Sequence, residues 1–131
     1  MNQYKQPIRS FRDLEIFQNS YQAMLIVMTK IIFLLPQEEK YDLCQQLRRS
    51  SKAIPRLIAE GYSKCHQKSG FKKYLSDALA ECNETIVSLE QCRDLFNVEE
   101  ALVKELIGVY DKTSRQIYKL MIAWSKKPFN Y

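Results

Sequence analysis

The chain carries a row of basic side chains within residues 41–61, and the row has the spacing needed to bind an anionic partner. Read as a helix, the segment gathers four cations on one face, namely Arg48, Arg49, Lys52 and Arg56. The opposite face is aliphatic and holds Leu43, Leu47, Ile54 and Ile58. Lysine and arginine that meet phosphates release counterions, so the basic face predicts sequence-independent, salt-sensitive binding of nucleic acid.

A second basic row falls near the end of the chain. Lys112, Arg115 and Lys119 are spaced i, i+3 and i+7, which places them on one side of a helix. Both rows have a plainer explanation, as solvated surface or as partners of acidic residues such as Glu81 on another subunit. No RNA-recognition motif of known fold is found, so any nucleic-acid binding is expected to follow shape and charge.

Positive and negative charges are segregated along the 131 residues. The formal net charge is +5 and the isoelectric point is about 9.0. Residues 48–73 hold eight basic and one acidic side chain, a net charge of +7. Residues 74–107 hold two basic and eight acidic ones, a net charge of −6. Such blocks are typical of an anion-binding surface, or of a positive face on one subunit that meets a negative face on the next.

Residues suited to catalysis or metal binding are few and poorly spaced. His66 is the only histidine and follows Cys65, whereas a zinc site needs two closely spaced ligand pairs. The three glycines are isolated, so the sequence has no glycine-rich phosphate loop. Adjacent glutamates at 38–39 and 99–100 fall at predicted helix starts, where the backbone charge already explains them. We therefore expect no enzymatic activity, no metal ion and no cofactor.

Apolar residues recur at intervals of three and four, which predicts four helices, at about 13–33, 38–63, 70–95 and 98–126. The connections between them are short, so consecutive helices must run antiparallel. The expected fold is all-α, an antiparallel up-down-up-down four-helix bundle that forms a single domain over residues 1–131. No strand pattern competes with this prediction.

Local signals predict details of these helices. Ser10, followed by Asp13, predicts the cap of the first helix, and Asn97, followed by Glu100, predicts the cap of the fourth. Pro55 lies inside the second helix, where a proline removes a hydrogen bond and costs about 3 kcal/mol. We expect a local bend at that point.

The first and last helices are more apolar than one packed face requires. The surplus residues are Leu25, Ile26, Val27 and Ile32 in the first helix and Ile107, Tyr110 and Met121 in the last. Apolar surface in excess of one core predicts contacts between subunits. The alternative is a broad core within a monomer of thick helices.

The second predicted helix also resembles a known family. Its letters QLRR and AIPRLIAEG, at 46–49 and 53–61, are similar to the segment QLRRAxxSIPxNIAEG. That segment belongs to four-helix-bundle proteins encoded in intervening sequences of bacterial 23S ribosomal RNA genes, whose relatives include accessory variability proteins of diversity-generating retroelements. Three further stretches are similar to the family in order and spacing: FRDLEIF at 11–17, LLPQEEKYDL at 34–43 and FKKYLSDALAECNET at 71–85.

The resemblance implies a four-helix bundle that assembles with itself, because characterised relatives form ring-shaped homopentamers. Glu60 and Glu84 match recurrent glutamates of the family, and we expect them to pair with Arg48 or Arg49 within or between subunits. The chain has Ala53 where the family usually has serine, and Leu57 where it usually has asparagine, so roles of those polar groups are not expected here.

The four cysteines would form a weak disulfide framework in a secreted protein. The chain shows no secretion signal, and its longest apolar run, residues 23–35, is interrupted by Lys30 and is too short to span a bilayer. We therefore expect a cytoplasmic protein with no membrane contact. The function that fits best is non-enzymatic binding of RNA or DNA by an oligomeric bundle. The alternative is a protein-interaction adaptor that docks an acidic partner or a reverse-transcriptase-like enzyme.

Overall fold

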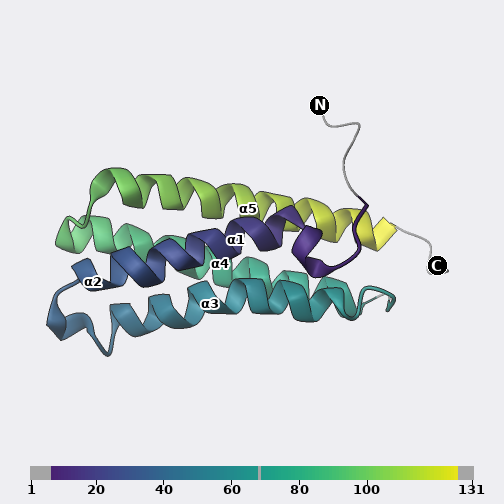
Figure 1. Ribbon diagram of the computed structural model, residues 1–131, viewed down its shortest axis with the longest axis horizontal. Helices are drawn as coiled ribbons and strands as arrows, with labels where there is room; N and C mark the ends of the chain where they lie inside the picture. The colour runs from purple at the N-terminus through teal and green to yellow at the C-terminus, as the bar shows by residue number, and fades with distance from the viewer. Residues whose placement is uncertain (1–6, 68, 127–131) are drawn as a thin grey trace.

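The computed structural model describes residues 7–67 and 69–126, and within them it contains helices and no strand. Four long rods lie side by side along the long axis of the molecule (Figure 1). The first rod consists of α1 (Glu15–Ile26), a π-helical segment (Val27–Ile31) and α2 (Ile32–Leu34); the others are α3 (Leu43–Tyr62), α4 (Gly70–Phe96) and α5 (Glu100–Lys126). The predicted all-α four-helix bundle is confirmed. The ends of the predicted domain, residues 1–6 and 127–131, lie outside the described residues.

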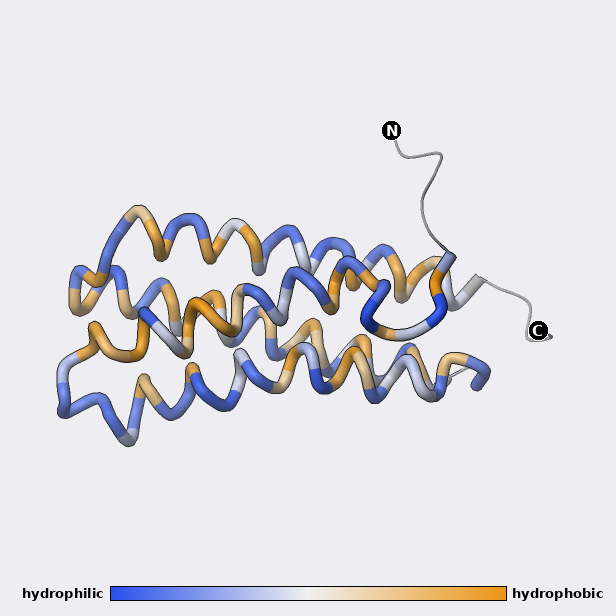
Figure 2. Tube along the Cα trace, in the orientation of Figure 1, coloured by the Kyte–Doolittle hydropathy of each residue, from blue (hydrophilic) through white to orange (hydrophobic). Residues whose placement is uncertain are grey.

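The four rods form a ring of neighbours. The helix α3 packs against α4 and α1, and α5 packs against the same two helices. Consequently α3 and α5 occupy diagonal corners of the bundle, as Figure 1 shows with α5 above and α3 below. Hydrophobic and hydrophilic residues alternate along every rod at helical spacing (Figure 2).

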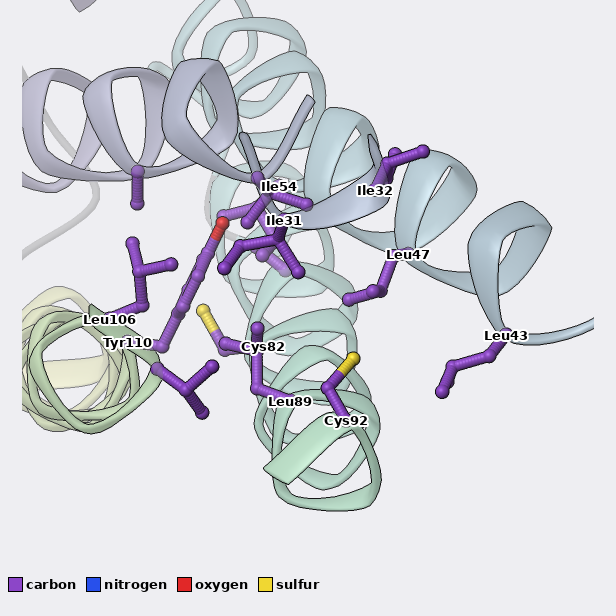
Figure 3. Packing of buried hydrophobic residues seen from close by; sticks show 14 of the residues in the cluster. Ile31, Ile32, Leu43, Leu47, Ile54, Cys82, Leu89, Cys92, Leu106 and Tyr110 are labelled. Atoms are coloured by element: carbon purple, nitrogen blue, oxygen red, sulfur yellow. The ribbon is translucent and has the colours of Figure 1, made fainter. Parts of the chain in front are cut away.

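The core is formed by the predicted apolar faces. Leu47, Ile54 and Ile58 of α3 are fully buried. Figure 3 shows Leu47 and Ile54 with Leu89 of α4 and Tyr110 of α5 in the space between the rods. A core of this extent within one chain provides most of the stabilisation of such a bundle, because burial of each large aliphatic side chain contributes about 1.5–3 kcal/mol.

Some of the apolar residues that were expected to exceed the needs of one packed face are in fact buried in the core. Val27, Ile32 and Tyr110 are all buried, so for them the expectation of exposed surplus is wrong. The π-helical segment Val27–Ile31 changes the angular spacing of the residues that follow it, which brings Ile32 to the interior. Leu25, another residue of the predicted surplus, is exposed, as are Phe33 and Leu34 at the end of the first rod and Tyr41 in the turn after it. Further exposed large apolar side chains lie on α4 and α5, namely Val87, Leu95, Tyr118 and Ile122.

The start of the first helix differs from the prediction. Ser10 and Asp13 do form a capping box, in which the Ser10 hydroxyl oxygen accepts from the Arg12 N–H at 3.1 Å and the Asp13 carboxylate accepts from the Ser10 N–H at 3.1 Å. The box closes a separate 3-10 turn, Phe11–Asp13, and α1 begins after it at Glu15. This turn contacts α3, which places Phe11 and Arg12 beside the second rod.

The second helix begins at Leu43, five residues later than predicted. Residues Gln37–Glu39 form a 3-10 turn, and the Glu39 carboxylate accepts a hydrogen bond from the Leu43 N–H at 3.4 Å. The helix then continues through the buried Pro55 to Tyr62, while the Ser51 hydroxyl donates to the Leu47 carbonyl at 2.6 Å. The bend expected at Pro55 stays a prediction.

Asn97 ends α4 rather than capping the start of α5. Its φ of 54° lies in the left-handed region, which asparagine tolerates better than most residues, and its N–H donates to the Arg93 carbonyl at 3.1 Å. The Val98 N–H donates to the Cys92 carbonyl at 3.3 Å, and α5 begins two residues later at Glu100. Asparagine is common at both kinds of helix terminus, so its position alone did not distinguish them.

Candidate nucleic-acid interface

The side of α3 that faces α4 is closely packed. A Cβ atom added to Gly61 would lie 2.6 Å from the Cβ of Tyr74 and 3.2 Å from the Phe71 ring, so the two helices approach closely at this point. Further along the contact, the Thr85 hydroxyl of α4 donates to the buried Ser50 hydroxyl of α3 at 2.8 Å. We call this the closed side of α3.

On the closed side, glutamates of α4 pair with Arg49, one of the residues predicted to contact nucleic acid. The Arg49 guanidinium donates to the Glu81 carboxylate at 3.0 Å and also pairs with Glu84. The hydrogen bond that Arg49 donates to Glu81 raises the pKa of Arg49 above its usual value. Because all three side chains are partly exposed, this pairing contributes at most about 1 kcal/mol to stability. Its main consequence is that Arg49 is occupied within its own chain.

The second predicted ion-pair residue, Glu60, has a different partner. Its carboxylate accepts a hydrogen bond from the Tyr74 hydroxyl at 3.4 Å, on the same closed side. No arginine pairs with Glu60 among the residues that the structure describes. The two recurrent glutamates therefore both lie at the contact between α3 and α4, where Glu84 pairs with an arginine and Glu60 with a tyrosine.

The side of α3 that faces α1 is open and basic. Lys52 and Arg56 are exposed there, and Arg12 of the 3-10 turn joins them at the rim of one pocket of about 460 Å³. Within residues 7–67 and 69–126, no carboxylate lies within 4.0 Å of any of these three cations. Arg12 instead lies over the Phe11 ring, with its Cζ 4.9 Å from the ring centroid.

Arg48 extends this row toward the other end of α3. It is half-buried and borders a second hollow of about 350 Å³ beside α2, together with Lys40. Arg48, Lys52 and Arg56 are spaced i, i+4 and i+8, so they follow one edge of the helix over about 12 Å. We call these three residues and Arg12 the open basic face.

The basic row on α5 is not part of this surface. Lys112, Arg115 and Lys119 lie at the diagonal corner of the bundle, and Arg115 pairs with Asp111 at 2.8 Å. Arg115 and Lys119 border a groove between α4 and α5. The two rows that the sequence predicts therefore lie on different surfaces of one chain.

Arg12 is a surface cation that periodicity did not reveal. It precedes the first helix, and its place beside α3 depends on the 3-10 turn that the Ser10 cap closes. The sequence does hold one signal, which is the run of aromatic residues Phe11, Phe17 and Tyr21 that lines the same pocket.

Three of the four cysteines are part of the hydrophobic core. All four have free thiols, and three are buried in the core: Cys44, Cys82 and Cys92. Burial raises the pKa of Cys82 and of Cys92 to about 12, so neither is a thiolate at neutral pH. In the described part of the chain, no three ligand-type side chains cluster to hold a metal ion. None of the described helices is both long and apolar enough to cross a lipid bilayer.

These features define an all-α four-helix bundle with a basic edge whose cations have no carboxylate partner among the described residues. The chain belongs to the family of 23S rRNA-intervening sequence proteins, whose family model matches residues 12–119. The match extends from the 3-10 turn through most of α5, so it covers the open basic face. Neither a curated protein nor a solved structure matches the chain.

Proposed function

We propose that this protein is a non-enzymatic, self-associating helical bundle that binds nucleic acid through phosphate contacts on its open basic face. The observation that carries the proposal is the contrast in pairing along α3. Arg49 is neutralised by α4, whereas Lys52 and Arg56 have no carboxylate partner in the described chain. Unpaired cations retain the counterion-release free energy that drives binding to phosphates.

The dimensions of the open basic face support backbone contacts. Its row on α3 extends over about 12 Å, and one strand of B-form DNA presents a phosphate about every 3.4 Å along the axis, so the row spans three to four phosphates. Phosphate contacts fix position and carry no sequence information. The proposal therefore predicts weak sequence preference and strong dependence on salt.

Exposed apolar side chains support self-association. Phe33 and Tyr41 are 77% and 79% exposed, and Leu34 is 49% exposed, at one end of the bundle. Aromatic side chains of this size are enriched at the cores of protein interfaces. The ring-shaped pentamer implied by the family resemblance is part of the proposal, and light scattering on a sizing column tests it. A monomer at micromolar concentration would refute it.

The free thiols support a cytoplasmic location, because a reducing compartment keeps cysteines unpaired. The alternative function, an adaptor for an acidic protein partner or a reverse-transcriptase-like enzyme, uses the same unpaired cations. The two functions differ in one respect: an adaptor has little affinity for bare nucleic acid and retains its protein partner in a pull-down.

Binding titrations with single-stranded and duplex oligonucleotides between 50 and 300 mM salt test the proposal. We expect Lys52→Gln with Arg56→Gln to weaken binding by about 10-fold or more at low salt. The double variant should also reduce the slope of log K against log salt by the amount expected for the loss of about two phosphate contacts. The matched control, Lys112→Gln with Lys119→Gln, removes the same charge from the diagonal corner and should change binding less. Absence of binding at 50 mM salt, or equal losses in the two double variants, would refute the assignment.

A further inference from the structure

The pocket on the open basic face has apolar walls and a charged rim. Its walls come from aromatic and aliphatic side chains of the 3-10 turn, α1 and α3, and its rim holds Arg12, Lys52 and Arg56. No acidic side chain lines it. The volume of about 460 Å³ lies within the range of about 300–1,000 Å³ typical of small-molecule sites.

The aromatic side chains of the pocket support one another. The Phe17 and Tyr21 rings stack with centroids 5.6 Å apart and planes inclined by 27°, and the Phe11 ring meets Phe17 edge-on at 4.9 Å. Phe17 packs against the core, so it anchors the other two rings. Tyr21 remains 42% exposed, so an aromatic surface is available to a ligand.

We infer that this pocket receives one unpaired base of a single-stranded nucleic acid, with Arg12, Lys52 and Arg56 contacting the flanking phosphates. The inference rests on the proposed function and identifies the form of nucleic acid that the open basic face prefers. A planar ring next to negative charge is the chemistry that stacked aromatics beside cations recognise, and a nucleotide in a flexible strand has both.

The composition of the pocket predicts which strands it accepts. A duplex keeps its bases paired inside the helix, so none can enter without unstacking. Apart from its three cations, the lining offers the Tyr21 hydroxyl as its only side-chain hydrogen-bonding group. Every base has an aromatic face, so we expect binding of single strands with little preference among bases.

A comparison of two oligomers with the same backbone tests the inference. One is a 12-residue thymidine strand, and the other is an abasic strand of the same length and charge. We expect the protein to bind the thymidine strand about 5-fold or more tightly than the abasic strand, because stacking is available only to the first. Tyr21→Ala should remove most of this preference and leave affinity for the abasic strand unchanged.

Two further variants test whether the preference for bases depends on this pocket. Tyr118→Ala removes an exposed tyrosine of the α4–α5 groove and should keep the full preference. Ala59→Leu adds side-chain volume inside the pocket while keeping all three of its rings, and should abolish the preference as Tyr21→Ala does. Thermal melts by circular dichroism verify that each variant is folded.

The possible outcomes separate the inference from the function beneath it. Failure of wild-type protein to bind either strand refutes the proposed function itself. Equal binding of both strands, or equal effects of Tyr21→Ala on both, overturns the pocket inference while leaving phosphate binding intact. A change of oligomeric state in Tyr21→Ala or Ala59→Leu, without a wild-type preference for bases, would assign the pocket to a subunit contact and also overturn the inference.

Discussion

The two sides of α3 differ in packing and in charge. Toward α4 the helix is closed: Gly61 allows close approach of Tyr74, and Arg49 is held by Glu81 and Glu84. Toward α1 the helix is open: a pocket of about 460 Å³ is lined by the 3-10 turn, α1 and α3, and Lys52 and Arg56 have no carboxylate partner in the described chain. One helix therefore packs tightly on one side and presents cations without carboxylate partners on the other.

The contrast shows how neighbours decide what a cation does. Arg49 and Arg56 belong to the same helix and to the same predicted basic face, seven residues apart. Acidic side chains of α4 meet the first, whereas aromatic side chains of the first rod and the turn before it line the pocket beside the second. Whether a basic residue on a helical bundle is available to bind a partner therefore depends on the side chains of the neighbouring helix.

The two thiols buried in the core give the largest expected change in stability, which appears when the pH is raised. The pKa of each of the buried thiols Cys82 and Cys92 is about 12 in the folded protein, against 9.0 for a free thiol. Above pH 9 the unfolded chain loses these protons and the folded protein keeps them, so stability is complete below pH 9 and falls as the pH rises toward 12. We expect a loss of about 2–3 kcal/mol between pH 8 and pH 10.

Urea unfolding with reductant at each pH measures this loss. Cys92→Ala should remove the contribution of one of the two thiols to the pH dependence of the unfolding free energy, whatever the substitution does to stability at neutral pH. An unfolding free energy that stays constant from pH 8 to pH 10 would show that the core around these two thiols is accessible to water.

The close approach on the closed side gives the next largest effect. Gly61→Ala introduces a Cβ 2.6 Å from Tyr74, so α3 and α4 must move apart, and we expect a loss of about 1–3 kcal/mol of unfolding free energy. Gly108→Ala is the matched control, because nothing lies within 4 Å of its added Cβ; it should gain about 0.5–1 kcal/mol. Equal stability changes in the two variants would remove the distinction between a packed and an unpacked side.

Removal of the acidic partners gives the smallest effect. Glu81→Gln with Glu84→Gln frees Arg49, and we expect a stability change below about 1 kcal/mol because the pairs are partly exposed. The freed cation and the lost negative charge should raise affinity for an oligonucleotide several-fold at low salt. Unchanged affinity in the binding titration would indicate that Arg49 already contacts nucleic acid in the unaltered protein.

The bundle could be predicted from the sequence more fully than the site. Periodicity identified the buried face of α3, and Leu47, Ile54 and Ile58 are indeed fully buried. Periodicity gives the angle of a side chain about its own helix and says nothing of the neighbouring rod. It therefore grouped Arg49 with Arg56, although their neighbours differ.

The remaining differences have the same origin. Helical periodicity does not predict the position of Arg12, because that position depends on how a 3-10 turn folds back on α3. The α5 row lies far from the α3 row because α3 and α5 occupy diagonal corners. The start of α3 at Leu43 differs from the predicted start because the preceding polar residues form a 3-10 turn, which composition does not distinguish from an α-helix.

The most direct test compares Arg49→Gln with Arg56→Gln in one salt titration of oligonucleotide binding. The two variants remove the same group from the same helix, but Arg49 is paired with Glu81 and Glu84, whereas Arg56 has no carboxylate partner in the described chain. We expect Arg56→Gln to weaken binding and to reduce the slope of log K against log salt by about 0.7–0.9, and Arg49→Gln to leave the slope unchanged. Equal reductions in both slopes, or a reduction for Arg49→Gln alone, would contradict the assignment of binding to the open side.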